Sequence, residues 1–133
     1  MKTTSYKISK KLAEIGFEGD ADYYYEKDKL EENDKWNITE LQFEGTDNYY
    51  PAYDLETILD ALPKERNLLT DFNHYLKIVF ENFEKREKAF IGYWDEEFYH
   101  SDFLVEQEET ESLADTAARL LILLHEKGIV DFK

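Results

Sequence analysis

The sequence contains no cysteine, and this absence excludes disulfide bonds, thiolate metal sites and a cysteine nucleophile. Its five glycines and two prolines leave little material for a phosphate-binding loop, and no nucleotide-binding or hydrolase motif occurs in it. No apolar run approaches the ~18 residues of a membrane span, and the lysine-bearing N-terminal segment lacks the apolar core of a signal peptide. We therefore expect a soluble, cytoplasmic protein without a cofactor.

Histidine is also scarce, and none of the three histidines is spaced from another like a metal-binding pair on a helix or hairpin. An imidazole and several carboxylates crowd together only at His100 and Asp102, which follow Asp95, Glu96 and Glu97. On a strand His100 and Asp102 point the same way, which makes them the candidate ligands for a divalent cation. The alternative, which the 31 acidic residues of the chain favour, is a solvated acidic edge with no metal.

The chain does contain enough apolar material for a hydrophobic core. Hydrophobic residues make up 42% and aromatic residues 16% of the sequence, proportions too high for a disordered protein. The length of 133 residues fits one ordinary domain, because single domains cluster at roughly 100 to 150 residues. We expect one domain that spans residues 1–133.

Acidic residues outnumber basic ones by 31 to 16, which gives a formal net charge of −15. Residues 1–17 run against this balance, with four lysines and one glutamate. An acidic surface repels phosphates and anionic lipids, so it disfavours direct binding of nucleic acid or a membrane and favours a basic protein partner. The plainer interpretation is that the charge keeps the protein soluble and monomeric.

Two early segments carry the apolar spacing and the end signals of helices. The first helix is predicted from Ser5 onward, with Gly16 placed to end it in a left-handed conformation. The second is predicted over residues 55–62, with Asp54 as its N-cap and Pro63 directly after its end.

The last predicted helix is the clearest. Ser112 caps its start, Asp115 is expected to answer it in a capping box, and Gly128 ends it. Its apolar stripe is wider than that of a surface helix. Either a sheet and a neighbouring helix cover this helix, or it pairs with a second copy in a homodimer.

The remaining runs are typical of strands. They lie at residues 20–28 and 35–44, which read as a hairpin with a long loop, and at residues 74–82, 89–94 and 97–107. Residues 45–50 read as a loop, and Pro51 as part of a turn. The order α-ββ-α-βββ-α predicts an α+β domain with an antiparallel sheet of about four to five strands and three helices packed on it.

Ten tyrosines are the most unusual feature, with a consecutive triple at residues 23–25 and a second group around Pro51. In a strand the triple places Tyr24 opposite to its two neighbours. If Tyr24, Tyr49 and Tyr50 converge, they form an amphipathic patch of the composition found in protein-binding surfaces. The alternative is that tyrosine simply covers a sheet while its hydroxyl stays wet. The candidate binding residues are Tyr24, Tyr49, Tyr50, Asp95, Glu96 and Glu97.

Four segments follow one another in a distinctive order. They are SKKLAEIGF at residues 9–17, DADYYYEKD at 20–28, YPAYDLETILDALP at 50–63 and ESLADTAARLLILLHEKGI at 111–129. In this series the chain resembles small uncharacterised proteins of phages and prophages of gut bacteria, the group described as a phage α-β-α sandwich. The resemblance implies an origin in a mobile element of bacteria, and it brings no activity and no site residues.

These observations predict a non-enzymatic protein that binds a basic protein partner through an acidic, tyrosine-rich surface. Carboxylates would steer the partner and tyrosines would supply the buried contact. A related alternative is an immunity protein, or an inhibitor of a nucleic-acid enzyme, since both commonly use small acidic domains. An alternative of another class is a metal-dependent enzyme centred on His100 and Asp102.

Overall fold

A computed structural model describes residues 3–27, 35–37, 49–67, 73–83, 86–95 and 101–132 of the chain. Side chains are described for all of these except residues 35–37, 65–67, 73, 83, 86 and 102. The helices found in these residues are α1 (Tyr6–Glu14), α2 (Leu55–Ala61) and α3 (Leu113–Glu126). The strands are β1 (Tyr23–Glu26), β2 (Lys35–Asn37), β3 (Tyr49–Ala52), β4 (Glu65–Asn67), β5 (Asn73–Phe83), β6 (Arg86–Trp94) and β7 (Ser101–Glu106).

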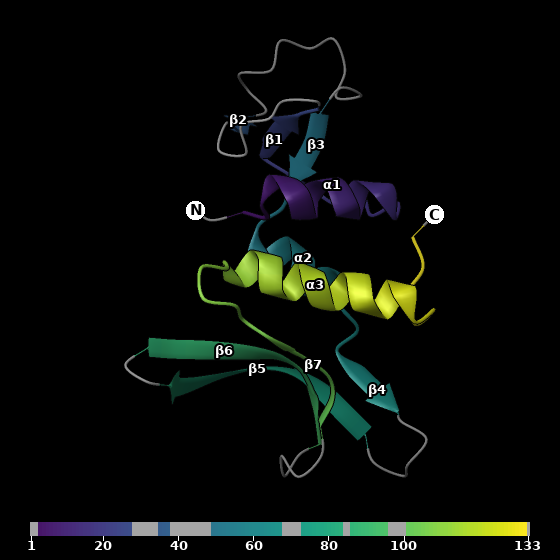
Figure 1. Cartoon of the computed structure of the whole chain (residues 1–133). Coiled ribbons are helices and arrows are strands. Elements are labelled where there is room, and N and C mark those ends of the chain that lie inside the picture. Colours follow the sequence, from purple (N-terminus) through teal and green to yellow (C-terminus); the bar gives the residue numbers. More distant parts are fainter. Residues whose placement is uncertain are drawn as a thin grey trace.

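The strands form two antiparallel sheets with the helices between them (Figure 1). The small sheet has the order β2-β1-β3 and the large sheet the order β4-β5-β6-β7. Helix α1 contacts β3 and α3, and α3 in turn contacts α2, β6 and β7. The predicted α+β class with three helices and antiparallel strands is confirmed, but the strands divide into two sheets where the sequence suggested one.

Gly16 at the end of α1 and Asp54 at the start of α2 act as the sequence predicts, and Ser5 is a further cap at the start of α1. The Ser5 hydroxyl accepts a hydrogen bond from the Ile8 N–H at 3.4 Å, and Gly16 follows the helix with a φ of +91°. The Asp54 carboxylate accepts from the Thr57 N–H at 2.8 Å. These side chains satisfy N–H groups that have no partner within their own helix.

Helix α3 begins as predicted, but its capping box is incomplete. The Ser112 hydroxyl accepts from the Asp115 N–H at 3.1 Å. The Asp115 carboxylate turns instead to α1, where its Oδ1 accepts from the Ser5 N–H at 2.7 Å. In a capping box that N–H is bound by the third residue of its own helix, which in α1 is the apolar Ile8. Asp115 therefore supplies to α1 what the sequence of α1 lacks.

The small sheet is built on β1, which pairs with a strand on either side. The pairing of β1 with β2 confirms the predicted hairpin. Strand β3 corrects a prediction, because Tyr49, Tyr50 and Pro51 lie in a strand and not in a loop and turn. Proline is tolerated there because β3 is an edge strand, where a missing N–H need not break the ladder.

The large sheet contains the predicted hairpin of β5 and β6, and β7 adds to it. A bulge interrupts the β6–β7 ladder, where Gly92 opposes both Phe103 and Leu104. Phe103 has a φ of +50°, which non-glycine residues rarely adopt. A Cβ on Gly92 would lie 2.9 Å from the Leu104 Cα and 2.9 Å from the Phe103 carbonyl oxygen. Glycine is therefore required for the two strands to approach at this bulge.

One hydrophobic core joins the helices to both β6 and β7. Helix α3 supplies more of it than any other element, and it has buried apolar residues on several of its sides: Ala114, Ala117, Ala118, Leu120, Leu121, Ile122 and Leu124. Helices α1 and α2 and the large sheet cover these residues. The wide apolar stripe of α3 is thus buried against its own chain. No helix in the described residues is long and apolar enough to span a membrane.

Candidate functional site

The candidate site is a groove of about 480 Å³ beside the small sheet. We call it the tyrosine groove. Its lining comes from the C-terminal part of α1, the connection that follows α1, and one face of the small sheet: Ala13, Gly16, Phe17, Glu18, Gly19, Tyr24, Lys27, Tyr49, Pro51 and Tyr53. Two of the six residues that the sequence singled out, Tyr24 and Tyr49, therefore lie in one groove.

The register of β1 and β3 explains why Tyr24 and Tyr49 share a face. Tyr24 pairs with Pro51, and Glu26 pairs with Tyr49. Alternate residues of a strand point to the same side of a sheet, so Tyr24, Tyr49 and Pro51 lie on one face. Both tyrosines are half-buried, which leaves part of each ring open to the groove.

Tyr50 does not join them, because it lies on the opposite face. There it packs against α1, with 5.7 Å between the ring centroids of Tyr50 and Tyr6, and Tyr25 contacts the same ring at 5.6 Å. The Lys27 ammonium lies 5.1 Å from the Tyr50 ring centroid, within the range of a cation–π interaction. The expected convergence of three tyrosines thus holds for two of them.

Tyr53 forms the buried end of the groove. It is 1% exposed, and its ring packs edge-on against Phe17 at 4.8 Å between centroids. Its hydroxyl accepts from the Gly19 N–H at 3.3 Å and donates to the Phe17 carbonyl at 3.4 Å. Burial raises the pKa of Tyr53 above its ordinary value of 10.0. These bonds fix the connection after α1 against the small sheet.

That connection carries an acidic rim. Glu18, Asp20 and Asp22 are all exposed on it, and Glu18 lines the tyrosine groove. Asp20 and Asp22 line a separate hollow of about 170 Å³, together with the capping residue Asp54. The sequence reasoning missed this rim because it sought the acidic surface after β6. The signal available was the alternation of acidic and small residues between Gly16 and Tyr23.

None of the acidic residues that we predicted as binding residues, Asp95, Glu96 and Glu97, is found among the described residues that line the groove. Asp95 is only 7% exposed, so its carboxylate does not offer an open acidic surface. Glu96, Glu97 and His100 lie outside the described residues, and the side chain of Asp102 is not described. Among the described residues, no group of three or more histidine, aspartate or glutamate side chains could hold a metal ion.

The tyrosine groove offers two half-buried tyrosine rings with their hydroxyls and the Glu18 carboxylate, and its one lysine, Lys27, already lies over the Tyr50 ring. Ring faces and carboxylates both attract lysine and arginine side chains. Comparison with known proteins adds nothing to this assignment, since no family model, curated protein or solved structure matches the chain.

Proposed function

We propose that this chain is a non-enzymatic binding protein that holds a basic segment of another protein in the tyrosine groove. The observation that carries the proposal is the convergence of Tyr24 and Tyr49 beside the Glu18 carboxylate. Tyrosine is enriched among the residues that dominate binding energy, because it buries a large apolar ring while keeping a polar hydroxyl.

The acidic rim supports a basic partner over an acidic one. Glu18, Asp20 and Asp22 form no ion pair with a described residue, and the chain as a whole has a net charge of −15. A field of this sign speeds the encounter with a cationic surface, and the gain falls as salt rises. The arrangement of Lys27 over Tyr50 shows within the chain the type of contact that a partner's lysine or arginine would make.

The resemblance of four segments to phage and prophage proteins supports a bacterial, cytoplasmic setting. In that setting, enzymes that act on nucleic acid are proteins with basic surfaces, because they bind phosphates. An acidic protein that occupies such a surface would act as an inhibitor or an immunity protein. We propose this class of target as the first to test.

The test measures binding of lysine- and arginine-rich peptides, with glutamate-rich peptides of matched length as the negative probe. We expect the wild type to bind the basic peptides alone. The double variant Tyr24→Ala/Tyr49→Ala should weaken binding by at least about tenfold, the size expected when an aromatic anchor is lost. Phe80→Ala serves as the control, because this aromatic residue is 52% exposed and lies on β5, away from the groove.

The variant Glu18→Gln/Asp20→Asn/Asp22→Asn tests the electrostatic contribution of the acidic rim. This variant should bind basic peptides with a lower association rate, and that rate should depend less on salt than in the wild type. Thermal unfolding of each variant shows that it is folded. Equal binding of basic and acidic peptides, or equal binding by the wild type and the tyrosine variant, contradicts the proposal.

A further inference from the structure

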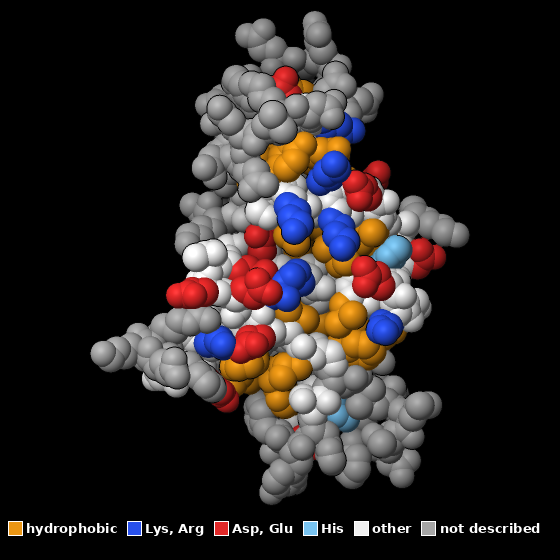
Figure 2. All heavy atoms as spheres, viewed as in Figure 1, with side chains coloured by type: hydrophobic (Ala, Val, Ile, Leu, Met, Phe, Trp, Pro, Cys, Tyr) orange, Lys and Arg blue, Asp and Glu red, His pale blue; other side chains and the backbone are white. Residues whose placement is uncertain are grey.

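A second groove, of about 580 Å³, lies between α1, α3 and β7. We call it the helical groove. Its floor is apolar and consists of Ile8, Leu104, Val105, Ile122 and Leu123. Figure 2 shows this face of the molecule, with apolar side chains open between charged ones. Leu104 is 45% exposed and is one of two large hydrophobic residues found exposed in the described part of the chain.

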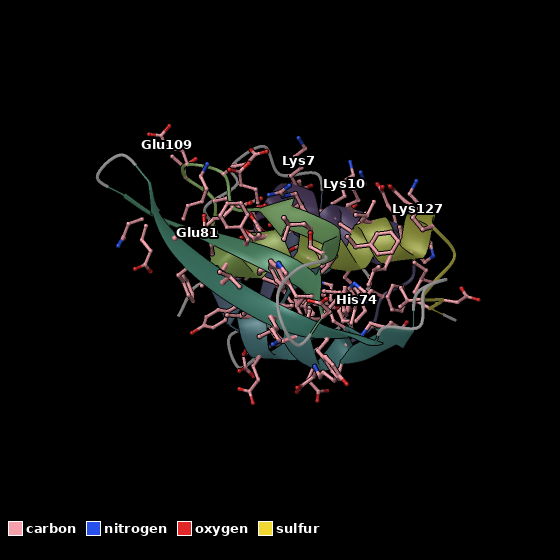
Figure 3. All side chains as sticks on the ribbon, turned by 90° about the horizontal axis from the view of Figure 1, so that it is seen from below. Lys7, Lys10, His74, Glu81, Glu109 and Lys127 are labelled. Carbon is pink, nitrogen blue, oxygen red and sulfur yellow. The ribbon has the colours of Figure 1, made fainter. Side chains whose placement is uncertain are left out.

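The two rims of the helical groove carry opposite charge. Lys7 and Lys11 stand on the α1 rim, and Glu108 and Glu126 stand on the rim formed by α3 and the connection from β7. All four side chains are exposed, and none forms an ion pair with a described residue. In Figure 3 Lys7 on α1 and Glu109, in the connection from β7 to α3, project from the same side of the molecule.

The other two charged residues that line the groove, Glu106 and Arg119, already have partners within the chain. Glu106 pairs with Lys88. Arg119 donates to the Glu111 carboxylate from Nε at 2.6 Å and from Nη2 at 2.5 Å. The charges left for an occupant are therefore two lysines on one rim and two glutamates on the other.

Lys7 is unfavourably placed within α1. It lies in the first turn of the helix, where the helix dipole disfavours a cation. Lys11 lies in the last turn, where the dipole favours its charge, but it stands four residues from Lys7 on the same face, and like charges at this spacing repel each other. This arrangement is explained if the lysines meet carboxylates that lie outside the chain.

We propose that the helical groove is the interface of a homodimer with twofold symmetry. A twofold axis that lies in the interface and runs parallel to the groove places the lysine rim of each copy against the glutamate rim of the other. The separation of the two rims is then matched automatically, because it is the same in both copies. Leu104, the most exposed residue of the floor, then packs against the apolar floor of the partner.

The charge pattern favours this occupant over an acidic peptide. A purely acidic segment would gain at Lys7 and Lys11 but would face Glu108 and Glu126 on the other side. A second copy satisfies both rims at once. The dimer uses a different surface from the tyrosine groove, and it does not depend on the proposed function.

The experiment is a charge swap read by sedimentation equilibrium. The wild type is expected to dimerise reversibly. The variants Lys7→Glu/Lys11→Glu and Glu108→Lys/Glu126→Lys should each be monomeric at concentrations where the wild type is a dimer, because each variant then has two rims of the same sign. An equimolar mixture of the two variants should form a heterodimer, because each rim again meets its opposite.

If the mixture of the two variants dimerises, misfolding is excluded as the reason why each variant alone is monomeric. Glu56→Lys/Asp60→Lys on the exposed face of α2 is the control for Glu108→Lys/Glu126→Lys, because it changes the net charge by the same amount. This control should dimerise like the wild type. A wild type that stays monomeric at its highest soluble concentration overturns the proposal and leaves the groove to another partner. A mixture that remains monomeric, or either swapped variant that dimerises alone, also overturns it.

Discussion

The carboxylate of Asp115, in the first turn of α3, accepts a hydrogen bond of 2.7 Å from the backbone N–H of Ser5, the N-cap of α1. A side chain of one helix thus supplies the acceptor at the N-cap of another helix that is far away in the sequence. Burial raises the pKa of Asp115 above its ordinary value of 3.8, although the bond to Ser5 acts in the opposite direction. The folded state therefore binds a proton at Asp115 more tightly than the unfolded chain does.

The first prediction concerns how stability depends on pH. The contribution of Asp115 is fully present below pH 3.8 and is lost as the pH rises through the raised pKa. Asp115→Asn keeps an oxygen that accepts from Ser5 and removes the ionisation. We expect the free energy of unfolding of the wild type, relative to Asp115→Asn, to fall as the pH rises from 3.8 toward neutrality. Urea titrations of both proteins across this range measure it.

Asp60→Asn on the exposed face of α2 is the control for loss of a carboxylate alone. Asp115→Ala adds a second comparison, because it leaves the Ser5 N–H without its acceptor and should cost about 1–2 kcal/mol at neutral pH. Parallel pH curves for the wild type and Asp115→Asn would show that the shifted proton affinity of Asp115 does not contribute.

The second prediction concerns the connection into α3. Glu111 accepts from Arg119, from the Thr116 hydroxyl at 2.8 Å and from the Glu108 N–H at 3.1 Å. Burial alone would raise the pKa of Glu111, but these hydrogen bonds outweigh it and hold the pKa below 4.5. Its contribution to stability is therefore present above pH 4.5 and is lost as the pH falls through the lowered pKa.

Glu111→Gln should cost about 1–2 kcal/mol at neutral pH, since it removes the charge from a hydrogen-bonded pair. The difference from the wild type should shrink under acid conditions. A double-mutant cycle with Arg119→Gln isolates the coupling between the two side chains. Additive losses in that cycle would mean that Glu111 and Arg119 act independently.

The third prediction concerns the bulge in the large sheet. Gly92→Ala places a methyl group against the backbone of Phe103 and Leu104, which cannot move without opening the β6–β7 ladder. We expect a loss of about 1–3 kcal/mol in unfolding free energy. Unfolding by denaturant measures it. A neutral result would require β7 to shift away from β6.

The fourth prediction compares two glycines that end helices. Gly16 and Gly128 have φ values of +91° and +75°, so alanine at either position incurs a backbone strain of about 1–2 kcal/mol. At Gly16 the added Cβ would also lie 3.0 Å from the Phe132 carbonyl oxygen, whereas at Gly128 it meets nothing within 4 Å. Gly16→Ala should therefore destabilise more than Gly128→Ala in thermal unfolding. Equal losses would indicate that residues around Phe132 yield to the methyl group without cost.

Local signals in the sequence were sufficient for the helices and for the hairpins. Caps such as Asp54, apolar spacing and alternating strands act over a few residues, so one sequence reveals them. The division into two sheets depends on which strands meet, and such long-range pairing leaves no local mark. The hydrogen bond between Asp115 and Ser5 could not be predicted for the same reason, because the two residues belong to different helices.

The candidate site was predicted in part for a related reason. Strand alternation placed Tyr24 apart from its neighbours, and the register of β1 and β3 then brought Tyr49 to its side. Tyr50 lies on the other face because neighbouring residues of a strand alternate, and the prediction of a loop at residues 45–50 misses this. The sequence shows how many residues are acidic but not which of them are exposed. Asp95 was therefore predicted to lie on the surface, although it is buried.

The bond between Asp115 and Ser5 also sets an order of assembly. The two residues are 110 positions apart, and a 9-residue helix such as α1 is too short to be stable alone in water. During synthesis α1 leaves the ribosome well before the carboxylate that completes its first turn. Helix α1 is thus the first helix described here to be made. Its partners in β3 follow early in the sequence, but the N–H of its N-cap Ser5 is left to water or another acceptor until Asp115 has been translated.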